Sequence, residues 1–353
     1  MHMPNRNEII YRIIEAAVDK GIKDITDNPN RGLRRLLDLG NHFAKKGFQK
    51  SFFRIASQVL NDESSPYYKL ADNIVRNVDP HIIKRFGINL GYNCWTYGAK
   101  KIREHEKING YNIPWTIVFY LQDETENGLS VSQISDILNT AESIGTFCGM
   151  FFLNEDIEKL RSIIKMLGEH RRSCYILFLK PEIISDEIAN LISGSYNIIV
   201  AFDTNDIENN QLCKNGARIL LDNKCLYGAY CTCNDSNLNY YISDSYLETL
   251  EDLKCSFAFY INKSLYEMKN KLMFSKFMSD SKYRGSYSLF LIDFYEDLSF
   301  IDRVISTDKC FIAIKNDGSI MTLKDGTSAK GLNIKTHSLK TILKKTMPRP
   351  QYI

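Results

Sequence analysis

The chain has 353 residues, of which 44% are hydrophobic and 25% are charged, and its formal net charge is +3. This composition is ordinary for a soluble globular protein, and the length allows one large core or two modest ones. No apolar run reaches the roughly 18–20 residues that cross a bilayer, which excludes a membrane-spanning segment. The N-terminal sequence MHMPNRNEII has no apolar signal region, so we expect a cytoplasmic protein.

Charge is distributed unevenly along the chain. Residues 1–110 contain 19 Lys or Arg and 12 Asp or Glu, a net of +7, and the remainder carries a net of −4. A basic segment can bind nucleic acid or an acidic partner, but no nucleic-acid motif accompanies it, which favours solvated helix faces. The nine cysteines are scattered and odd in number, which indicates reduced, buried thiols and not a disulfide framework.

Helical patterns fill the first hundred residues. Apolar residues recur at three- and four-residue spacing over RGLRRLLDLGNHFAKKGFQKSFFRIASQVLN. SSPYYKLADNIVRNV predicts a further helix, with a serine cap ahead of Pro66. GINLGYNCWTYGAKKIREHEK predicts a glycine-rich turn at Gly91 and Gly98 that leads into a basic helix. No low-complexity linker follows, so we expect residues 1–110 to pack against the next region.

From Trp115 onward, short apolar runs alternate with amphipathic helical patterns. We predict six strands, at 116–121, 148–153, 174–179, 196–202, 226–233 and 255–261. Nearly continuous apolar runs are typical of parallel strands covered on both faces, and six strand–helix units in series favour a partial barrel over an open sheet. The expected fold is therefore α/β, a partial (β/α)6 TIM-like barrel with its functional face at the carboxyl ends of the strands.

The residues after the sixth strand predict an extension of this barrel. A helix is expected at about 264–280, followed by a strand in SLFLIDF and by a hairpin in FIAIKNDGSIMTL that turns at Asn316, Asp317 and Gly318. We therefore expect three parts: an N-terminal helical region at 1–110, a partial barrel at 111–280, and a strand and hairpin extension with a basic tail at 281–353.

This order of elements resembles the radical S-adenosylmethionine (SAM) superfamily, and most closely its members with a C-terminal SPASM or twitch-type extension. YNIPWTIVFYL is similar to that family's lead-in and first strand, LSVSQISDILNTAESIG to its first helix, and FIAIKNDGSIMTL to its closing hairpin. The resemblance covers roughly residues 110–345. It implies a C-x3-C-x2-C loop after the first strand, whose three thiolates hold a [4Fe–4S] cluster with an open iron that binds and cleaves SAM.

The loop after the first strand departs from that family. Between Leu121 and Ser130 it contains no cysteine and too few residues for the three-thiolate motif. Its acidic residues Asp123, Glu124 and Glu126 are hard oxygen ligands, which suit an iron–sulfur core poorly.

The other cofactor positions depart as well. The second strand leads directly into Asn154, where the family has a Gly-Gly-Glu-Pro stretch that meets the SAM amino group, and the third strand ends at Lys180 and Pro181 in place of a Thr-Asn-Gly turn. The positions that match auxiliary-cluster cysteines are Val304 and Leu323. Because all the cofactor positions are altered together, we expect no iron–sulfur cluster and no bound SAM. The barrel mouth is expected to be filled by side chains or by water.

Two further patterns were weighed as metal sites. Cys231 and Cys233 share one face of a strand and could bind zinc, but the paired C-x2-C knuckles of structural zinc sites are missing, which favours buried core thiols. The six histidines show no ligand spacing, and His105, within REHEK, is expected on a solvated helix face. The sequence contains no G-x-S-x-G elbow, phosphate loop or dinucleotide fingerprint.

The candidate ligand site is the polar set at the predicted strand ends. Asn and Asp also favour strand ends and helix caps for structural reasons, so each residue alone is more simply explained by capping. The eight candidates are Gln122, Asp123, Asn154, Lys180, Asp203, Asn205, Asn234 and Asn262.

Two classes of function are consistent with these observations. The first is a radical-SAM-like pseudoenzyme, a non-catalytic binding or regulatory protein that associates with a catalytic relative, a peptide substrate or another protein. Its basic, aromatic N-terminal region would supply a docking surface. The second is an enzyme, which would hold a cluster through other ligands such as Cys94 and Cys148, or would use the mouth residues without a cofactor. We expect a protein or peptide partner, no membrane partner and no nucleic acid, and a homo-oligomer is possible.

Overall fold

A computed structural model describes residues 6–43, 54, 56–123, 125, 127–205, 211–306, 308, 310–322 and 328–349. The N-terminal region is helical, as predicted. Its helices are α1 (Arg6–Asp27), α2 (Pro29–Phe43), α4 (Pro66–Asn77), α5 (Pro80–Ile88), the π-helix η1 (Asn89–Gly98) and α6 (Ala99–Asn109). In the part of the chain that the structure describes, no helix is long and apolar enough to cross a bilayer.

Ten strands form one sheet in the order β10-β9-β8-β1-β2-β3-β4-β5-β6-β7. Strands β1 to β7 are all parallel and in sequence order, and β8 pairs parallel with β1 on the other side. The predicted α/β class and the parallel strands are confirmed. The strands are β1 (Thr116–Tyr120), β2 (Cys148–Phe152), β3 (Cys174–Leu179), β4 (Ile198–Asp203), β5 (Tyr227–Asn234), β6 (Phe257–Ser264), β7 (Phe290–Asp293), β8 (Ile312–Lys315), β9 (Ser319–Thr322) and β10 (Ser328–Asn333).

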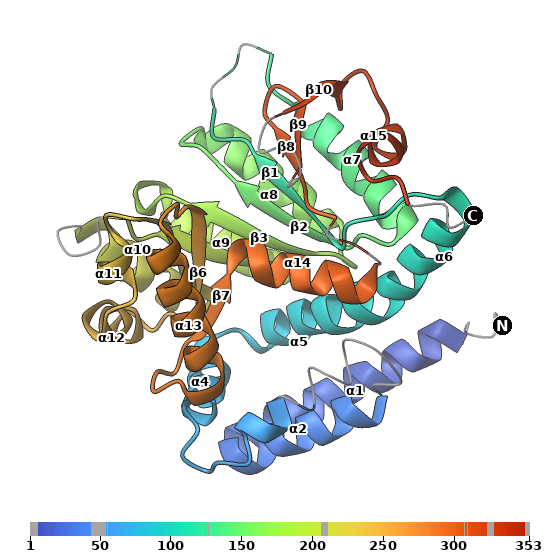
Figure 1. Ribbon diagram of the computed structural model, residues 1–353. Coiled ribbons are helices and arrows are strands. Elements are labelled where there is room, and N and C mark those ends of the chain that lie inside the picture. Colours follow the sequence, from blue (N-terminus) through green and yellow to red (C-terminus); the bar gives the residue numbers. More distant parts are fainter. Residues whose placement is uncertain are drawn as a thin grey trace.

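Helices follow most of the strands. Because crossovers between parallel strands are right-handed, a sheet wound in sequence order carries its crossover helices on one face. Figure 1 shows α8 and α9 of this layer behind the sheet, whereas α14 (Phe294–Ile305) crosses the opposite face. The crossover helices are α7 (Val131–Ile144), α8 (Ile157–Glu169), α9 (Asp186–Ser195) with η2 (Pro181–Ile183) before it, α10 (Gln211–Asp222), α11 (Leu238–Tyr241), α12 (Asp244–Asp252) and α13 (Met268–Arg284).

The sheet is strongly curved around the face that α14 covers. Phe178 on β3 and Phe259 on β6 lie three strands apart, yet their ring centroids are 5.2 Å apart. In a flat sheet with strands about 4.8 Å apart, the same positions would be separated by roughly 14 Å. The concave face therefore has the curvature of a partial barrel, although the strands at its two ends do not pair with each other.

The strands of the predicted extension belong to the same sheet. β7 continues the parallel order beyond β6, and β8 and β9 form the predicted hairpin beside β1. Gly318, at φ +86°, adopts the left-handed conformation that the three-residue turn requires. After β10, α15 (Leu339–Thr346) packs near α7. The domain boundaries at 110 and 280 stay a prediction.

Two local predictions for the N-terminal region are wrong: the turn at Gly91 and Gly98, and the serine cap ahead of Pro66. No turn interrupts the chain at Gly91 or Gly98, because α5, η1 and α6 continue from one into the next. Gly98 is needed for packing: a Cβ there would lie 2.5 Å from the carbonyl oxygen of Gly145, which follows α7. Ser65 precedes Pro66 at the start of α4, but its side chain accepts no capping hydrogen bond.

A buried carboxyl group fixes α14 to the segment that leads into β1. Asp302 accepts hydrogen bonds from the backbone N–H groups of Trp115 (3.2 Å) and Cys310 (3.3 Å), and the Trp115 indole donates to the Leu298 carbonyl. Burial raises the pKa of Asp302 to about 7. The two hydrogen bonds lower this pKa, whereas the nearby charge of Glu106 raises it further.

The raised pKa of Asp302 makes stability depend on pH. In the unfolded chain, an Asp side chain releases its proton at about pH 4. In the folded protein, Asp302 keeps its proton up to about pH 7. Between these two pH values, the native state therefore binds one proton more than the unfolded chain. The free energy of unfolding should therefore fall as the pH rises through this window. Urea unfolding at pH 5 and pH 8 should show that Asp302→Asn reduces this fall, whereas Asp136→Asn, on the exposed surface of α7, leaves it unchanged. Equal slopes in all three proteins would contradict the assignment.

Candidate functional site at the carboxyl ends of the strands

Aromatic side chains fill the concave face of the sheet near the strand ends. Phe294, the first residue of α14, is fully buried and lies 5.7 Å from Phe152 and 5.8 Å from Phe178, ring centroid to centroid. The ring of Phe259 lies 6.2 Å from the ring of Phe294, and Tyr230 packs edge-on against Phe178. The first turn of α14 thus occupies the middle of the barrel mouth with apolar, closely packed atoms.

Two of the predicted site residues lie together at the end of β4. Asp203 accepts hydrogen bonds from the backbone and side-chain N–H groups of Asn205 and, at 3.2 Å, from the hydroxyl of Tyr230. Asn205 in turn accepts from the Thr232 backbone N–H and the Tyr241 hydroxyl. Burial raises the pKa of Asp203 despite these hydrogen bonds. The cluster fixes the loop after β4 to β5.

Asn262 contacts a carboxyl group that the sequence analysis missed. Its amide donates to Asp293 (3.1 Å) at the end of β7, and Asp293 also caps α14 by accepting from the backbone N–H groups of Tyr295 and Glu296. Burial raises the pKa of Asp293 to about 6. Because Asp293 directly follows the apolar run of SLFLIDF, applying the strand-end rule to the seventh strand would have found it.

Asn316 fastens the loop after β1 to the β8–β9 turn. Its amide donates to the Asp123 carbonyl (2.7 Å), its side-chain oxygen accepts from the Lys159 ammonium (3.1 Å), and both of its oxygens accept from the Leu129 N–H. Asn316 is only 3% exposed. A Cβ at Gly128 would lie 2.8 Å from the same side-chain oxygen, so the loop can lie this close only with glycine there. The sequence indicated Asn316 as a turn residue but not as this link.

The remaining predicted residues do not converge on one point. Gln122 and the Asp123 side chain are exposed, and Asn154 accepts from the Asp156 N–H within its own turn. Lys180 pairs with Glu155 at 2.8 Å on the surface. Asn234 accepts three hydrogen bonds from Ser236 and Asn237, which close the turn after β5. These contacts are the local capping chemistry that was weighed against ligand binding.

The residues present do not fit a [4Fe–4S] cluster at the barrel mouth. All nine cysteines are free and buried, and none belongs to the loop after β1. Cys94 and Cys174 lie 3.6 Å apart, next to Cys148, at the amino ends of β2 and β3, away from the mouth. Burial raises the pKa of Cys94 and Cys174, which disfavours the thiolate form that binds iron. Of the other positions matched to the family, Val304 lies within α14, and Glu124, Glu126 and Leu323 lie outside the described residues.

The thiols considered for zinc are core residues. Cys231 and Cys233 lie 3.9 Å apart on β5, both fully buried. Among the described residues, no three His, Cys, Asp or Glu side chains are grouped as metal ligands.

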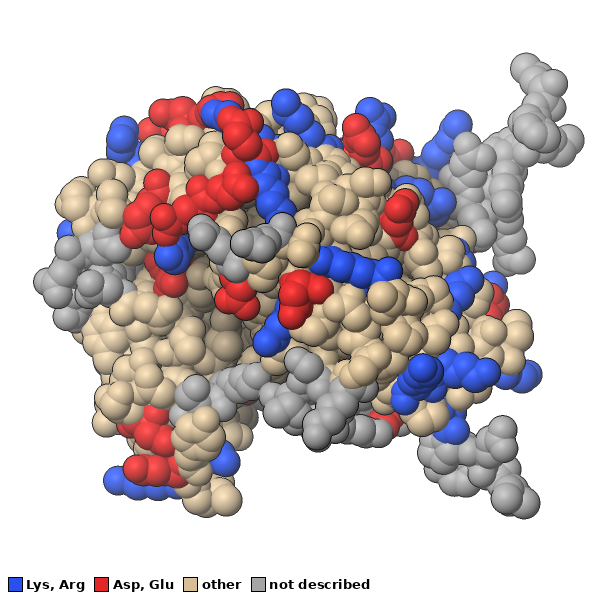
Figure 2. Space-filling model, turned by 90° about the horizontal axis from the view of Figure 1, so that it is seen from above, with Lys and Arg blue, Asp and Glu red and all other residues tan. Residues whose placement is uncertain are grey.

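Charged side chains of both signs cover the surface. On the face shown in Figure 2, acidic side chains gather toward the upper left and basic ones toward the lower right, with apolar and neutral residues between them. Basic residues therefore share this face with acidic ones.

Comparison with known proteins gives likenesses of structure only. No protein-family model and no curated protein sequence matches the chain. Among solved structures, native anSMEcpe with bound AdoMet and Cp18Cys peptide is similar, with 11% identity, a TM-score of 0.45, and coverage of 66% of this chain and 80% of that one. Native anSMEcpe with bound AdoMet has 12% identity and a TM-score of 0.42, over 64% of this chain and 79% of that one.

A third likeness belongs to a different enzyme. Phosphonopyruvate hydrolase in complex with oxalate and Mg²⁺ has 8% identity and a TM-score of 0.33, and the match covers 62% of this chain and 79% of that one. All three TM-scores are below 0.5, so the account of function depends on the residues of this chain.

Phe294 provides a test of the aromatic packing on the concave face. Phe294→Ala should lower the free energy of unfolding by about 3–5 kcal/mol, because it removes a buried ring from a packed aromatic cluster. Urea unfolding measures the change. Phe300→Ala, on the same helix but 42% exposed, is the matched control and should have a much smaller effect. Similar losses for both variants would show that Phe294 does not hold the cluster together.

Asn316 provides a test of the fastened loop. Asn316→Ala should cost about 1–3 kcal/mol of stability, because buried hydrogen-bonding groups lose their partners, and it should speed amide hydrogen exchange at Leu129. Asn190→Ala, which removes an exposed asparagine that bonds only within its own helix, is the control. Unchanged exchange at Leu129 in Asn316→Ala would contradict the role assigned to this side chain.

Proposed function

We propose that this protein is a non-catalytic binding protein on a radical-SAM-like fold, which acts by associating with a protein or peptide partner. The observation that carries the proposal is the position of Phe294. Its ring lies among Phe152, Phe178 and Phe259 on the concave face of the sheet, where a barrel enzyme of this kind would need open space for its cofactor. A catalytic relative, or the peptide substrate of one, is the partner that the resemblance suggests.

The loop after β1 supports the same proposal. Productive SAM binding needs an open cluster iron, but this loop contains no cysteine and is held by Asn316 against the β8–β9 turn. Without the iron, SAM would be left with ordinary hydrogen bonds worth about 0.5–1.5 kcal/mol each. Several of these would be needed to offset the several kcal/mol lost when a ligand is immobilised.

An exposed apolar surface near the end of β6 would suit a protein partner. Tyr266, Met268 and Leu272 are 76%, 67% and 65% exposed. Asp235 holds the start of α13 by accepting from the Tyr266 backbone N–H (3.0 Å) and the Asn270 amide (2.9 Å). Apolar side chains presented on an anchored segment lose little freedom on binding, which favours their use in an interface.

The alternative is an enzyme with a non-standard site. An enzyme of this kind would need to hold its cluster through buried thiols such as Cys94 and Cys148, which lie beside Cys174 away from the mouth, although the described residues include no group of three side chains placed to bind a metal. A cofactor-free enzyme would instead use Asp203, or Asp293 with its pKa of about 6. The burial of the three thiols and of the aromatic mouth favours the binding protein.

Anaerobic reconstitution with iron and sulfide distinguishes these functions. The protein should retain almost no iron after desalting and show no charge-transfer absorption, and calorimetric titration with SAM should give no saturable heat. About four irons per chain, the content of a [4Fe–4S] protein, would contradict the proposal. Loss of that iron in Cys174→Ser, but not in Cys255→Ser, would then assign the cluster to the alternative thiol site.

A further inference from the structure

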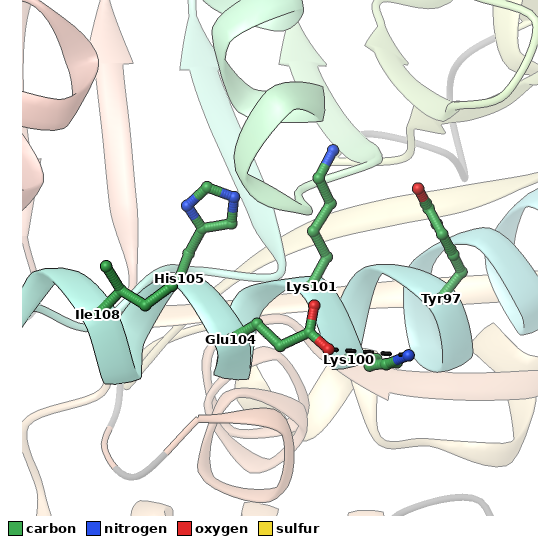
Figure 3. Close-up of a pocket in the computed structure, with 6 residues that line it drawn as sticks. All are labelled: Tyr97, Lys100, Lys101, Glu104, His105 and Ile108. Atoms are coloured by element: carbon green, nitrogen blue, oxygen red, sulfur yellow. Dashed lines mark ion pairs between the residues drawn. The ribbon is translucent and has the colours of Figure 1, made fainter.

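A pocket of about 340 Å³ lies along α6, near the amino ends of the first strands and away from the barrel mouth. Figure 3 shows Tyr97, Lys101 and His105 projecting from one side of the helix toward α7, with Lys100 and Glu104 at the near edge. Ile108 completes the lining and is 81% exposed. The pocket is concave, and most of its polar groups are hydrogen-bond donors.

Lys101 is a partly buried cation in the lining of this pocket. Its ammonium donates to the backbone carbonyl of Glu142 (2.9 Å) and lies 5.9 Å from the centre of the Phe147 ring. Among the described residues, no carboxylate forms an ion pair with it. Burial lowers the pKa of Lys101, and Arg172 lowers it further, while the charge of Glu142 opposes them. A partly buried ammonium with neutral partners has donors left for an anion.

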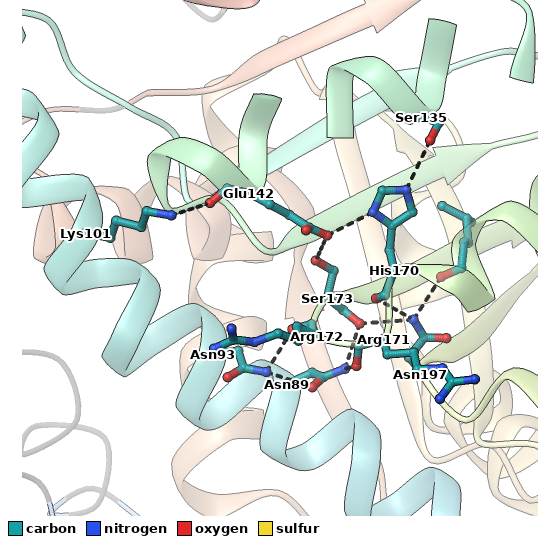
Figure 4. A network of polar contacts seen from close by, with 11 residues as sticks. Asn89, Asn93, Lys101, Ser135, Glu142, His170, Arg171, Arg172, Ser173 and Asn197 are labelled. Carbon is teal, nitrogen blue, oxygen red and sulfur yellow. Dashed lines mark hydrogen bonds and ion pairs between the residues drawn. The ribbon is translucent and has the colours of Figure 1, made fainter. Parts of the chain in front are cut away.

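The Glu142 side chain is engaged in contacts of its own, as Figure 4 shows. The Glu142 carboxylate accepts from the Ser173 hydroxyl (2.6 Å) and pairs with the His170 imidazole (3.0 Å), while its backbone carbonyl faces Lys101. Burial tends to raise the pKa of Glu142, but these two hydrogen bonds outweigh it and the pKa is lowered. Glu142 is therefore held as a carboxylate within its own network and does not form an ion pair with Lys101.

The other charged groups around the pocket add positive potential. Lys100 pairs with Glu104 across the surface at 3.7 Å. Arg172 lies over the Tyr97 ring, with its guanidinium carbon 5.3 Å from the ring centre. Burial lowers the pKa of His105, and Lys101 and Lys340 of α15 lower it further while Glu104 opposes them. Cations on α6, on α15 and in the loop before β3 therefore contribute positive potential near the pocket.

We propose that this pocket binds the oxyanion group of a small organic acid, with Lys101 and His105 as donors and with Tyr97 and Ile108 against the apolar part of the ligand. A carboxylate or a phosphate can accept from N–H donors on one side of a helix, and an exposed aliphatic side chain beside them favours a ligand that also has an apolar part. The site does not depend on the closed barrel mouth, so it goes beyond the proposed function. The carboxylate can belong to a free acid or to the C-terminus of a peptide.

Titration of the His105 imidazole by NMR tests the site directly, and His105→Gln identifies its resonances. The probes are inorganic phosphate, 4-methylpentanoate, and N-acetyl-leucine as a mimic of a peptide C-terminus, with N-acetyl-leucinamide as the neutral control. Saturation with an anion should raise the pKa of His105, because a bound negative charge stabilises the imidazolium. Tighter binding of 4-methylpentanoate indicates a free acid, and tighter binding of N-acetyl-leucine indicates a peptide terminus.

Substitutions of Lys101 separate binding from a general charge effect. Lys101→Met should weaken binding about tenfold or more, because it removes a charged donor, whereas Lys101→Arg should largely restore it. Lys165→Met, an exposed lysine on α8, should leave affinity unchanged, and thermal unfolding checks that each variant is folded. The proposal is wrong if no anion gives a saturable shift, if the amide binds as well as the acid, or if Lys101→Met binds like the wild type.

Discussion

The packing of Phe294 into the curve of the sheet is the contact on which the rest of the structure depends. A curved parallel sheet leaves a concave face that must be filled by a ligand, by water or by side chains. Here the filling comes from the chain itself, because α14 returns across the face that its own strand, β7, helps to form. Close packing of this kind stabilises the fold.

Two further links follow from the position of α14. At its start, Asp293 caps the helix and receives the amide of Asn262 from β6. Toward its other end, Asp302 binds the backbone ahead of β1. The helix therefore joins the two sides of the parallel sheet, which are not paired with each other. In a closed barrel, pairing between the first and last strands holds the curvature of the sheet. Here α14 has that role.

The sequence predicts the strands well because their signal is local. Each apolar run is bounded by polar turns, and the predicted strand at 174–179 agrees residue for residue with β3. The continuous helix through Gly91 and Gly98 was missed, because glycine disfavours a helix locally, while at Gly98 close packing against Gly145 requires glycine. The roles of Asn316 and Phe294 were missed for a related reason: both depend on contacts with residues more than a hundred positions away.

The candidate site also depends on contacts that the sequence does not show. Strand-end polarity selected eight residues, but polarity at a strand end does not distinguish a ligand contact from a cap, and most of these side chains are used in turns. By contrast, Lys101 carries no motif, and its significance comes from the orientation of Glu142, which directs its carboxylate toward His170 and Ser173. An unpaired charge is a property of three-dimensional surroundings. In this chain, whose concave face is packed with aromatic rings, a partly buried charge such as that of Lys101 is therefore a better guide to binding chemistry than polarity at the strand ends.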